Sequence, residues 1–309
     1  MNSTTDMPIR DTLSQSGTNV TVTILMCVLV IAPVGDLLIL VTILQTRKLR
    51  RPLYLLMANI FLSDICFVTI SLPLNIATLL HGFPPYGTVV CYIQSFVTFG
   101  AISSSACAIC SIAVYRLTQV CWSSVYIRIS TWKYMSVVMA AVWTVPVVMA
   151  AAVGGSVEYI DYKFTCDHTG PHLDVVSITA LYLPIVATIL GCYVKLYLHT
   201  KNALQRVQAV MTLPLPAASH DVNRKMDDVI FRCIMIIFVE FIGFYVGPGV
   251  LNAIRNKSDP PSKGIIGIIS FSVYRIHPLV RMCTSVVLNK ELRDAVLKLV
   301  RVVNVDRRR

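Results

Sequence analysis

Six ionisable residues lie inside stretches of the chain that are otherwise apolar and long enough to cross a bilayer. Three are acids and three are bases: Asp36, Asp64, Glu240, Arg275, His277 and Arg281. An ionisable group inside a bilayer is costly unless it has a partner or water. These residue types therefore indicate either an internal network of ion pairs or a polar path that binds or carries an ion.

Helical spacing brings most of the six groups to a common depth. At about 1.5 Å per residue from the expected inner ends of the spans, they fall in one layer roughly 9–20 Å deep. Asp36 and Asp64 would repel each other there unless a cation sits between them, and the arginines or His277 can supply it. We favour an ion-paired network. A sodium ion near Asp64 is one alternative, and placements toward lipid or water, in which the groups never touch, are another.

Seven apolar stretches position these residues. They cover residues 20–45, 53–80, 88–115, 134–154, 173–199, 229–254 and 264–287. Each exceeds the roughly 20 residues that a helix needs to span about 30 Å of hydrocarbon. The chain is 55% hydrophobic and 14% charged, which is too apolar for a soluble domain of 309 residues. Barrel strands would be shorter and would alternate, so we predict an all-α membrane protein with a seven-transmembrane helix bundle.

The parts outside the bundle are short. Residues 1–19 form an expected extracellular N-terminal segment, the bundle occupies residues 20–287, and residues 288–309 form a cytoplasmic amphipathic helix and basic tail. In that tail apolar residues alternate with basic ones in the pattern of a helix that lies on the inner leaflet. The lipid bilayer is thus an expected partner of both the bundle and the tail.

Lysine and arginine divide unequally between the two sets of connecting segments. The loops after the first, third and fifth spans, with the adjoining span ends and the C-terminal tail, carry twenty of the 27. The N-terminal segment and the loops after the second, fourth and sixth spans carry five. Basic residues accumulate on the cytoplasmic side, so the N-terminus is expected outside and the C-terminus inside a plasma-membrane protein. The net charge of +11 then describes a basic face beside anionic lipid, and no nucleic-acid partner is expected.

Glycosylation signals and cysteines agree with this topology. Asn-X-Ser/Thr triplets begin at Asn2, Asn19 and Asn256, all on the side expected to be extracellular. Eight of the ten cysteines lie within or at the ends of spans, where a thiol behaves as a small apolar residue. Cys91 and Cys166 instead face the oxidising side. We expect them to be bonded, with two free thiols as the alternative.

Several single residues within the spans have a characteristic type and spacing. Arg116 follows Cys91 by 25 residues, and the other markers are Asp64, Trp143, Pro184, Pro248 and Pro278. This set resembles the rhodopsin-like G protein-coupled receptors. The resemblance implies a small-molecule ligand, a heterotrimeric G protein as partner and no cofactor. It also implies that Ser105 lies beside Asp64, where relatives share a sodium site with a helix-one asparagine that is Asp36 here.

A longer segment points to one branch of that family. The run from Pro52-Leu53-Tyr54 through Asn59 to Ser63-Asp64-Ile65-Cys66-Phe67 resembles a segment of olfactory receptors. Asn289-Lys290-Glu291 also resembles the start of their eighth helix. This favours a chemosensory, odorant-like or related orphan receptor.

The chain departs from the family pattern at residues that relatives use for switching. Tyr115 stands where relatives carry an acid before the arginine, and Leu117 stands where they carry a tyrosine after it. Val246 stands in place of a tryptophan. In the Asn-Pro-X-X-Tyr motif, His277 replaces the asparagine and Arg281 replaces the tyrosine. Asp228 precedes Pro248 by 20 residues, where relatives often place an acidic partner for the arginine, although a solvated loop acid has the same pattern. The expected coupling and switch residues are Arg116, Asp228, Pro278 and Arg281.

Family geometry implies a pocket that opens outward between helices three, five, six and seven. The residues expected to line it are Thr98, Phe99, Ile102, Ser103, Val250, Gly267 and Phe271. The set carries no charge, which favours a small, largely apolar ligand over an amine held by a salt bridge. The alternative for each residue is ordinary packing.

Other function classes fit the sequence less well. No catalytic motif such as His-Glu-X-X-His or Gly-X-Ser-X-Gly occurs, so an enzyme is not expected. Intramembrane charges also occur in ion-coupled transporters, but the paired interrupted helices of such proteins are missing. A non-coupling receptor that acts as a decoy or as a dimer partner remains the main alternative, because the switch motifs are altered.

Overall fold

The computed structural model describes residues 15–152, 157–160, 165–168, 181–210 and 260–306, together with positions 243, 247, 251 and 254. The elements are the helices α1 (Gln15–Gln45), α2 (Pro52–Cys66), α3 (Leu72–His81), α4 (Thr88–Cys121), α5 (Ser123–Ile129), α6 (Trp132–Ala152), α8 (Leu183–Val210), α11 (Pro260–Leu288) and α12 (Lys290–Asp306), the short turns η2 (Arg47–Leu49) and η3 (Phe67–Ser71), and the strands β1 (Val157–Ile160) and β2 (Thr165–His168).

Six helical stretches of the described chain are long and apolar enough to cross a membrane. They are α1, the continuous run from α2 to α3, α4, α6, α8 and α11. The predicted class, an all-helical membrane bundle followed by a short amphipathic helix, is confirmed. The predicted sixth span, residues 229–254, lies almost wholly outside the described residues. α4 extends to Cys121, beyond the predicted end at residue 115, because polar residues continue the helix past its apolar part.

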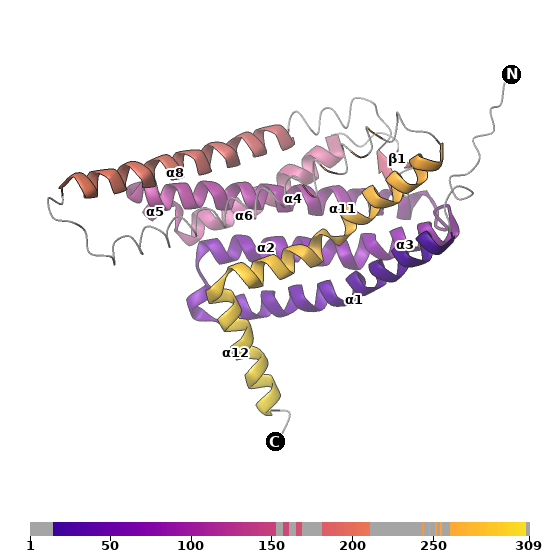
Figure 1. The fold of residues 1–309 in the computed structure, drawn as a ribbon, viewed down its shortest axis with the longest axis horizontal. Helices are drawn as coiled ribbons and strands as arrows, with labels where there is room; N and C mark the ends of the chain where they lie inside the picture. Colours follow the sequence, from indigo (N-terminus) through magenta and orange to yellow (C-terminus); the bar gives the residue numbers. More distant parts are fainter. Residues whose placement is uncertain are drawn as a thin grey trace.

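The helices lie side by side along one long axis, with α1 and α8 at opposite edges of the view and α4 between them (Figure 1). α4 contacts α2, α6 and α8, whereas α1 contacts α2, α3 and α11. α12 leaves α11 at an angle at the end of the bundle where α1 ends (Figure 1). Leu292 and Val296 of α12 are buried against α1 and α2, so one face of this amphipathic helix belongs to the core.

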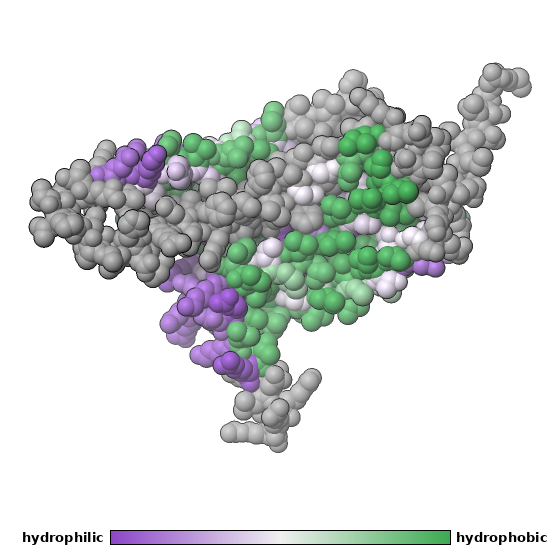
Figure 2. Space-filling view, viewed as in Figure 1, coloured by the Kyte–Doolittle hydropathy of each residue, from purple (hydrophilic) through white to green (hydrophobic). Residues whose placement is uncertain are grey.

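The surface matches a chain that crosses a bilayer. Figure 2 shows hydrophobic side chains over the middle of the helices and hydrophilic ones over α12 and the far end of α8. Large aliphatic side chains of α1 are exposed, among them Val30 at 63% and Val34 at 66%. Such exposure is costly in water but is expected where lipid is the solvent.

A wide turn divides the second span. Residues Phe67–Ser71 form a π-helical turn, directly before Pro73, whose ring nitrogen has no hydrogen to donate to the preceding turn. The extra residue changes the register of α3, so that Ser71 and Asn75 contact α4. α3 then ends at Gly82, whose φ of 78° lies in the left-handed region that favours glycine.

A small antiparallel hairpin closes one end of the bundle. β1 pairs with β2 with Tyr159 opposite Cys166, and both strands contact α4. A disulfide joins Cys166 to Cys91 at the start of α4, the pair expected from the sequence. The hairpin itself was not predicted, because four-residue strands leave no clear alternation in the sequence.

Candidate functional site

An ion pair lies at the centre of the bundle. Arg281 Nη1 of α11 donates to both carboxylate oxygens of Asp64 on α2, at 3.0 and 3.3 Å. His277 Nε2, one turn earlier on α11, lies 3.6 Å from Asp64 Oδ1. All three side chains are at most 4% exposed, so little water reaches the pair. With Asp36, these residues form what we call the inner polar layer, because it is the one nearer to α12.

The ring orientation of His277 follows from its second contact. Nδ1 lies 2.8 Å from the carbonyl oxygen of Tyr274, and a carbonyl can only accept, so Nδ1 carries a hydrogen. The ring also packs against Phe67, with 5.4 Å between the centroids. His277 is therefore held with Nε2 toward Asp64.

Asp36 of α1 is fully buried beside the ion pair. The charges of both Asp64 and Arg281 act on its carboxyl group. Neither oxygen of Asp36 has a hydrogen-bond partner among the described residues, and the same is true of the Ser105 hydroxyl on α4. Ser104, one residue earlier, is the serine that contacts α2, through Ser63 at 3.4 Å.

A close approach of two helices places Asp36 in this layer. A Cβ atom on Gly35 would collide with the side chain of Met282, next to Arg281 on α11. Gly35→Ala is therefore expected to lower the free energy of unfolding by about 1–3 kcal/mol through overpacking, measured as a lower thermal midpoint.

Two variants check that explanation. Met282→Ala should restore much of the stability of Gly35→Ala, since it removes the colliding atoms. Gly191→Ala, at a helical position with open space around it, should not destabilise the protein. A Gly35→Ala protein as stable as wild type would contradict the expected overpacking and show that the Met282 side chain moves out of this contact at little cost.

Arg275 lies in a different layer, about six residues farther from α12. Nη2 donates to Asn75 Oδ1 at 2.8 Å and Nη1 donates to the carbonyl of Phe271 at 3.0 Å. The guanidinium also lies over the Phe271 ring, 3.5 Å from its centroid. Arg275 thus does not join Asp64, although the helical count had placed it at a similar depth, and Glu240 lies outside the described residues.

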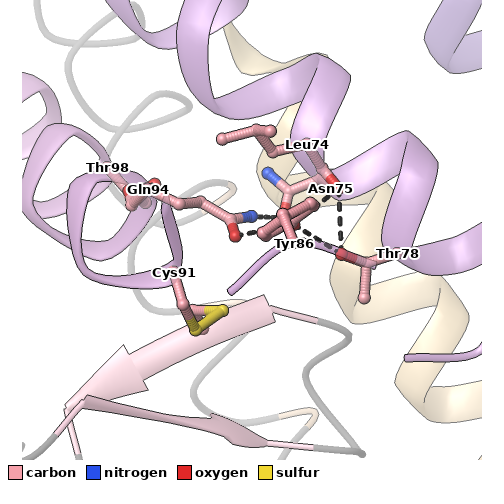
Figure 3. The surroundings of a disulfide bond; sticks show 8 residues. Leu74, Asn75, Thr78, Tyr86, Cys91, Gln94 and Thr98 are labelled. Carbon is pink, nitrogen blue, oxygen red and sulfur yellow. Dashed lines mark hydrogen bonds between the residues drawn. A yellow bond between two sulfur atoms is a disulfide. The ribbon is translucent and has the colours of Figure 1, made fainter. Parts of the chain in front are cut away.

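Four neutral side chains surround Arg275 and form a second layer with it. We call this the outer polar layer and define it as Ser71, Asn75, Gln94, Thr98 and Arg275. Gln94 Nε2 donates to Asn75 Oδ1 at 2.8 Å, and Asn75 Nδ2 donates to Ser71 at 3.2 Å. The hydroxyls of Ser71 and Thr98 lie 2.6 Å apart. Figure 3 shows Gln94 reaching from α4 toward Asn75. The layer joins α3, α4 and α11.

Tyr86 connects the outer polar layer to the disulfide end of the bundle. Its hydroxyl lies 2.7 Å from Thr78 and 2.9 Å from Gln94 Oε1, and its ring packs beside Cys91 and Cys166 (Figure 3). Burial raises the pKa of the Tyr86 phenol, so the group stays protonated and can donate. Sequence reasoning missed Tyr86, Gln94 and Asn75, although a polar amide inside an apolar run is itself a signal.

The residues expected to bind a ligand lie in several environments. Ile102 and Phe271 share one apolar cluster, and the half-buried Phe99 packs against another. Ser103 lies 3.1 Å from the Tyr182 hydroxyl, and the Thr98 hydroxyl contacts Ser71 and the Gln94 carbonyl. Gly267 is buried in α11, and Val250 lies outside the described residues. The expected set is uncharged, but it adjoins the Arg275 guanidinium.

A polar contact also joins the middle of three helices. Trp143 Nε1 of α6 donates to Asn59 Oδ1 of α2 at 2.6 Å, and Asn59 Nδ2 donates to Ser104 of α4 at 3.5 Å. The sequence resemblance had marked Trp143 without naming its partner.

A cavity of about 670 Å³ opens at the end of the bundle near α12. Its lining includes four cationic residues and one acid, namely Arg51, Arg116, Arg281, Lys290 and Glu291. We call it the basic cavity. Arg281 is shared between this cavity and the inner polar layer, so the two are adjacent.

The surroundings of Arg116 differ from the family pattern. The Tyr115 hydroxyl lies 3.1 Å from Ser130, and the Tyr115 ring contacts Tyr126. Pro278 lies within α11, one residue after His277. Asp228, the expected partner of Arg116, lies outside the described residues.

Two further expectations can be placed only in part. Asn19 is exposed in the first turns of α1, where its carbonyl accepts from Thr23 at 2.9 Å. Asn2 and Asn256 lie outside the described residues, so the glycosylation sites stay predictions.

The inner polar layer does not fit a bound sodium ion. Both oxygens of Asp64 already accept from Arg281, and a positive guanidinium at 3.0 Å would repel a metal cation at the same oxygens. The described residues contain no cluster of three or more His, Cys, Asp or Glu side chains that could hold a metal. The sodium alternative is therefore not supported.

Comparisons with known proteins agree with the arrangement of the helices. Residues 35–285 match the family described as "7 transmembrane receptor (rhodopsin family)". Melatonin receptor type 1B of Rattus norvegicus is 26% identical over 227 residues, which are 72% of this chain and 59% of that receptor. Melatonin receptor type 1B-A of Danio rerio is 24% identical over 243 residues, 76% of this chain and 80% of that receptor.

A third relative aligns over a smaller part of the chain. Endothelin receptor type B of Rattus norvegicus is 29% identical over 146 residues, 46% of this chain and 33% of that receptor. This chain spans about three fifths of the length of the rat melatonin receptor. None of these three relatives is an odorant receptor by name, so the olfactory branch stays a prediction.

Proposed function

The chain belongs to the rhodopsin family of seven-transmembrane receptors, and from that membership we propose that it is a G protein-coupled receptor for a small, largely apolar ligand. It is a multi-pass membrane protein of a receptor family and not of an enzyme family. Ligand binding between the helices would change the end of the bundle that contacts a heterotrimeric G protein.

The basic cavity is the observation that carries this proposal. It is lined by residues of α2, α4, α5, α8, α11 and α12, and half-buried Arg116 lies at its wall on α4. About 670 Å³ is enough to admit the end of a protein segment, and its cationic lining favours an acidic or carboxylate-bearing one.

We place the basic cavity in the cytoplasm of a plasma-membrane protein and the disulfide hairpin outside the cell. The excess of lysine and arginine in the loops and tail at the cavity end supports this orientation. The same orientation puts the Cys91–Cys166 bond in an oxidising compartment.

For the ligand, the relatives suggest the first compound to try. Two of them are named as melatonin receptors, and the mostly apolar surroundings of Ile102 and Phe271 suit a small aromatic molecule. The segment similar to olfactory receptors makes odorants the second group to test. The outer polar layer, with Asn75, Gln94 and Arg275, would then form a polar wall of the pocket toward its disulfide end.

A receptor that binds ligand without coupling is the second candidate. Tyr115 contacts Ser130 where relatives carry an acid beside the arginine, and Arg281 is engaged with Asp64 where they carry a tyrosine. Such a chain would act as a decoy or as a dimer partner of another receptor.

A G protein activation screen at equal surface level separates the two candidates. Cells expressing wild type should activate at least one G protein class, basally or with melatonin or an odorant panel. Arg116→Ala should reduce that signal at least about tenfold, because it removes the cation at the cavity wall. Arg128→Ala, an exposed arginine on α5 outside the cavity lining, is the matched control and should signal normally. Equal signals from wild type and Arg116→Ala would contradict the assigned role of Arg116.

A further inference from the structure

Carboxylate groups of two helices lie near the guanidinium of Arg281. Both carboxylate oxygens of Asp64 accept from it, and Asp36 on α1 lies close enough for the arginine charge to act on its carboxyl group. We propose that Arg281 is a tethered cation that fills a site whose carboxylate oxygens would otherwise bind a small metal cation.

The donor set explains which ion would bind if Arg281 were absent. Carboxylate oxygens are hard ligands, and hard cations such as sodium, magnesium and calcium prefer them. Both acids are at most 1% exposed, and a buried Asp64 carboxylate needs a positive charge nearby. Sodium is the abundant hard monovalent cation in ordinary assay buffer and is therefore the probe.

Tethering changes how the site responds to its surroundings. A diffusible ion occupies a site in proportion to its concentration, and it stabilises the folded state accordingly. Arg281 is part of the chain, so its charge is present at every salt concentration. The Gly35–Met282 contact brings α1 against α11 beside Arg281, which keeps Asp36 within reach of the same cation. The wild-type protein should therefore be insensitive to sodium.

His277 does not substitute for the arginine. Its Nδ1 hydrogen is engaged by the Tyr274 carbonyl, and Nε2 lies 3.6 Å from Asp64 Oδ1, compared with 3.0 Å for Arg281. Asp64 thus loses its shorter contact when Arg281 is removed. The proposal concerns ion binding by the folded chain and holds whether or not the receptor couples to a G protein.

The test is the thermal midpoint of the purified full chain in sodium chloride and in choline chloride at equal ionic strength. Wild type should show the same midpoint in both salts. Arg281→Gln should gain about 3–5 °C in sodium at about ten times the dissociation constant, and the gain should saturate. Arg281→Lys keeps a tethered cation and should show no gain. Asp64→Asn combined with Arg281→Gln should also show none, because it removes the main oxygen ligands.

Two results would overturn the proposal. One is a saturable sodium-dependent rise in the wild-type midpoint that Asp64→Asn abolishes, since a diffusible cation would then already occupy the site. The other is an Arg281→Gln protein whose response to sodium equals that of wild type. If Arg281→Gln does not fold, the wild-type comparison decides alone, with no rise supporting the tethered cation and a saturable rise contradicting it.

Discussion

Asp64→Asn is expected to lower the free energy of unfolding by about 3–5 kcal/mol, because it leaves the buried Arg281 guanidinium without the carboxylate that faces it. The substitution keeps the size of the side chain, so the loss reports charge and not a cavity. Measured as a thermal midpoint in detergent, it should exceed the loss caused by Asp36→Asn, whose carboxyl has no hydrogen bond among the described residues.

Removing both charges tests whether the loss comes from the pair. Asp64→Asn with Arg281→Gln should recover a large part of the lost stability, since neither charge then remains buried alone. Asp294→Asn is the matched control, because Asp294 pairs with Arg293 at the exposed surface of α12 and should change stability little. Additive losses in the double variant would show that Asp64 and Arg281 do not stabilise the fold as a pair.

Cys91→Ser is expected to cost about 2–5 kcal/mol and to reduce the amount of receptor at the cell surface. The bond closes a segment of 75 residues and fixes the β1–β2 hairpin on the end of α4. Both sulfurs are buried beside Val157 and Tyr86, so the loss also loosens the apolar contacts of that end.

The stability losses of the single and double cysteine variants show whether the two cysteines share one bond. Cys166→Ser and the double variant should each lose about as much as Cys91→Ser, since one bond is removed in all three. Cys283→Ser, an exposed free cysteine, should behave like wild type. Reducing agent should lower the wild-type midpoint and leave the Cys91→Ser midpoint unchanged. Additive losses in the double variant would contradict a shared bond.

The sequence predicted the spans well because their signal is long and strong. About 20 consecutive apolar residues leave little choice of structure, and the positions of α1, α4, α6 and α11 follow from it. The Cys91–Cys166 disulfide could also be predicted, since only these two cysteines lay on the oxidising side. The hairpin that carries Cys166 was not predicted, because two four-residue strands are too short for a clear pattern and they pack on α4, which is distant in the sequence.

The depth of the charged residues along their helices was predictable only in part. Asp64, His277 and Arg281 meet, with Asp36 beside them, as expected for one layer. Arg275 instead turns to Asn75, because its six-residue separation from Arg281 places it about 9 Å farther along α11. The π-helical turn before Pro73, which the sequence did not predict, aims Asn75 at this position.

The altered switch residues gain a physical explanation from the structure. Arg281 replaces the expected tyrosine and takes the role of a permanent cation beside Asp64 while it also lines the basic cavity. A segment that enters the cavity would therefore contact a residue that holds α2 to α11. Tyr115, which replaces the acid, contacts Ser130 and leaves Arg116 at the cavity wall.

The most direct test of the receptor proposal is nucleotide exchange on purified heterotrimeric G proteins of each class, catalysed by the purified chain in a lipid nanodisc. Wild type should accelerate exchange on at least one class, Arg116→Ala should not, and Arg128→Ala should match wild type. A folded wild-type chain with its disulfide formed that accelerates exchange on no class, with melatonin or odorants present, would contradict coupling and favour the non-coupling receptor.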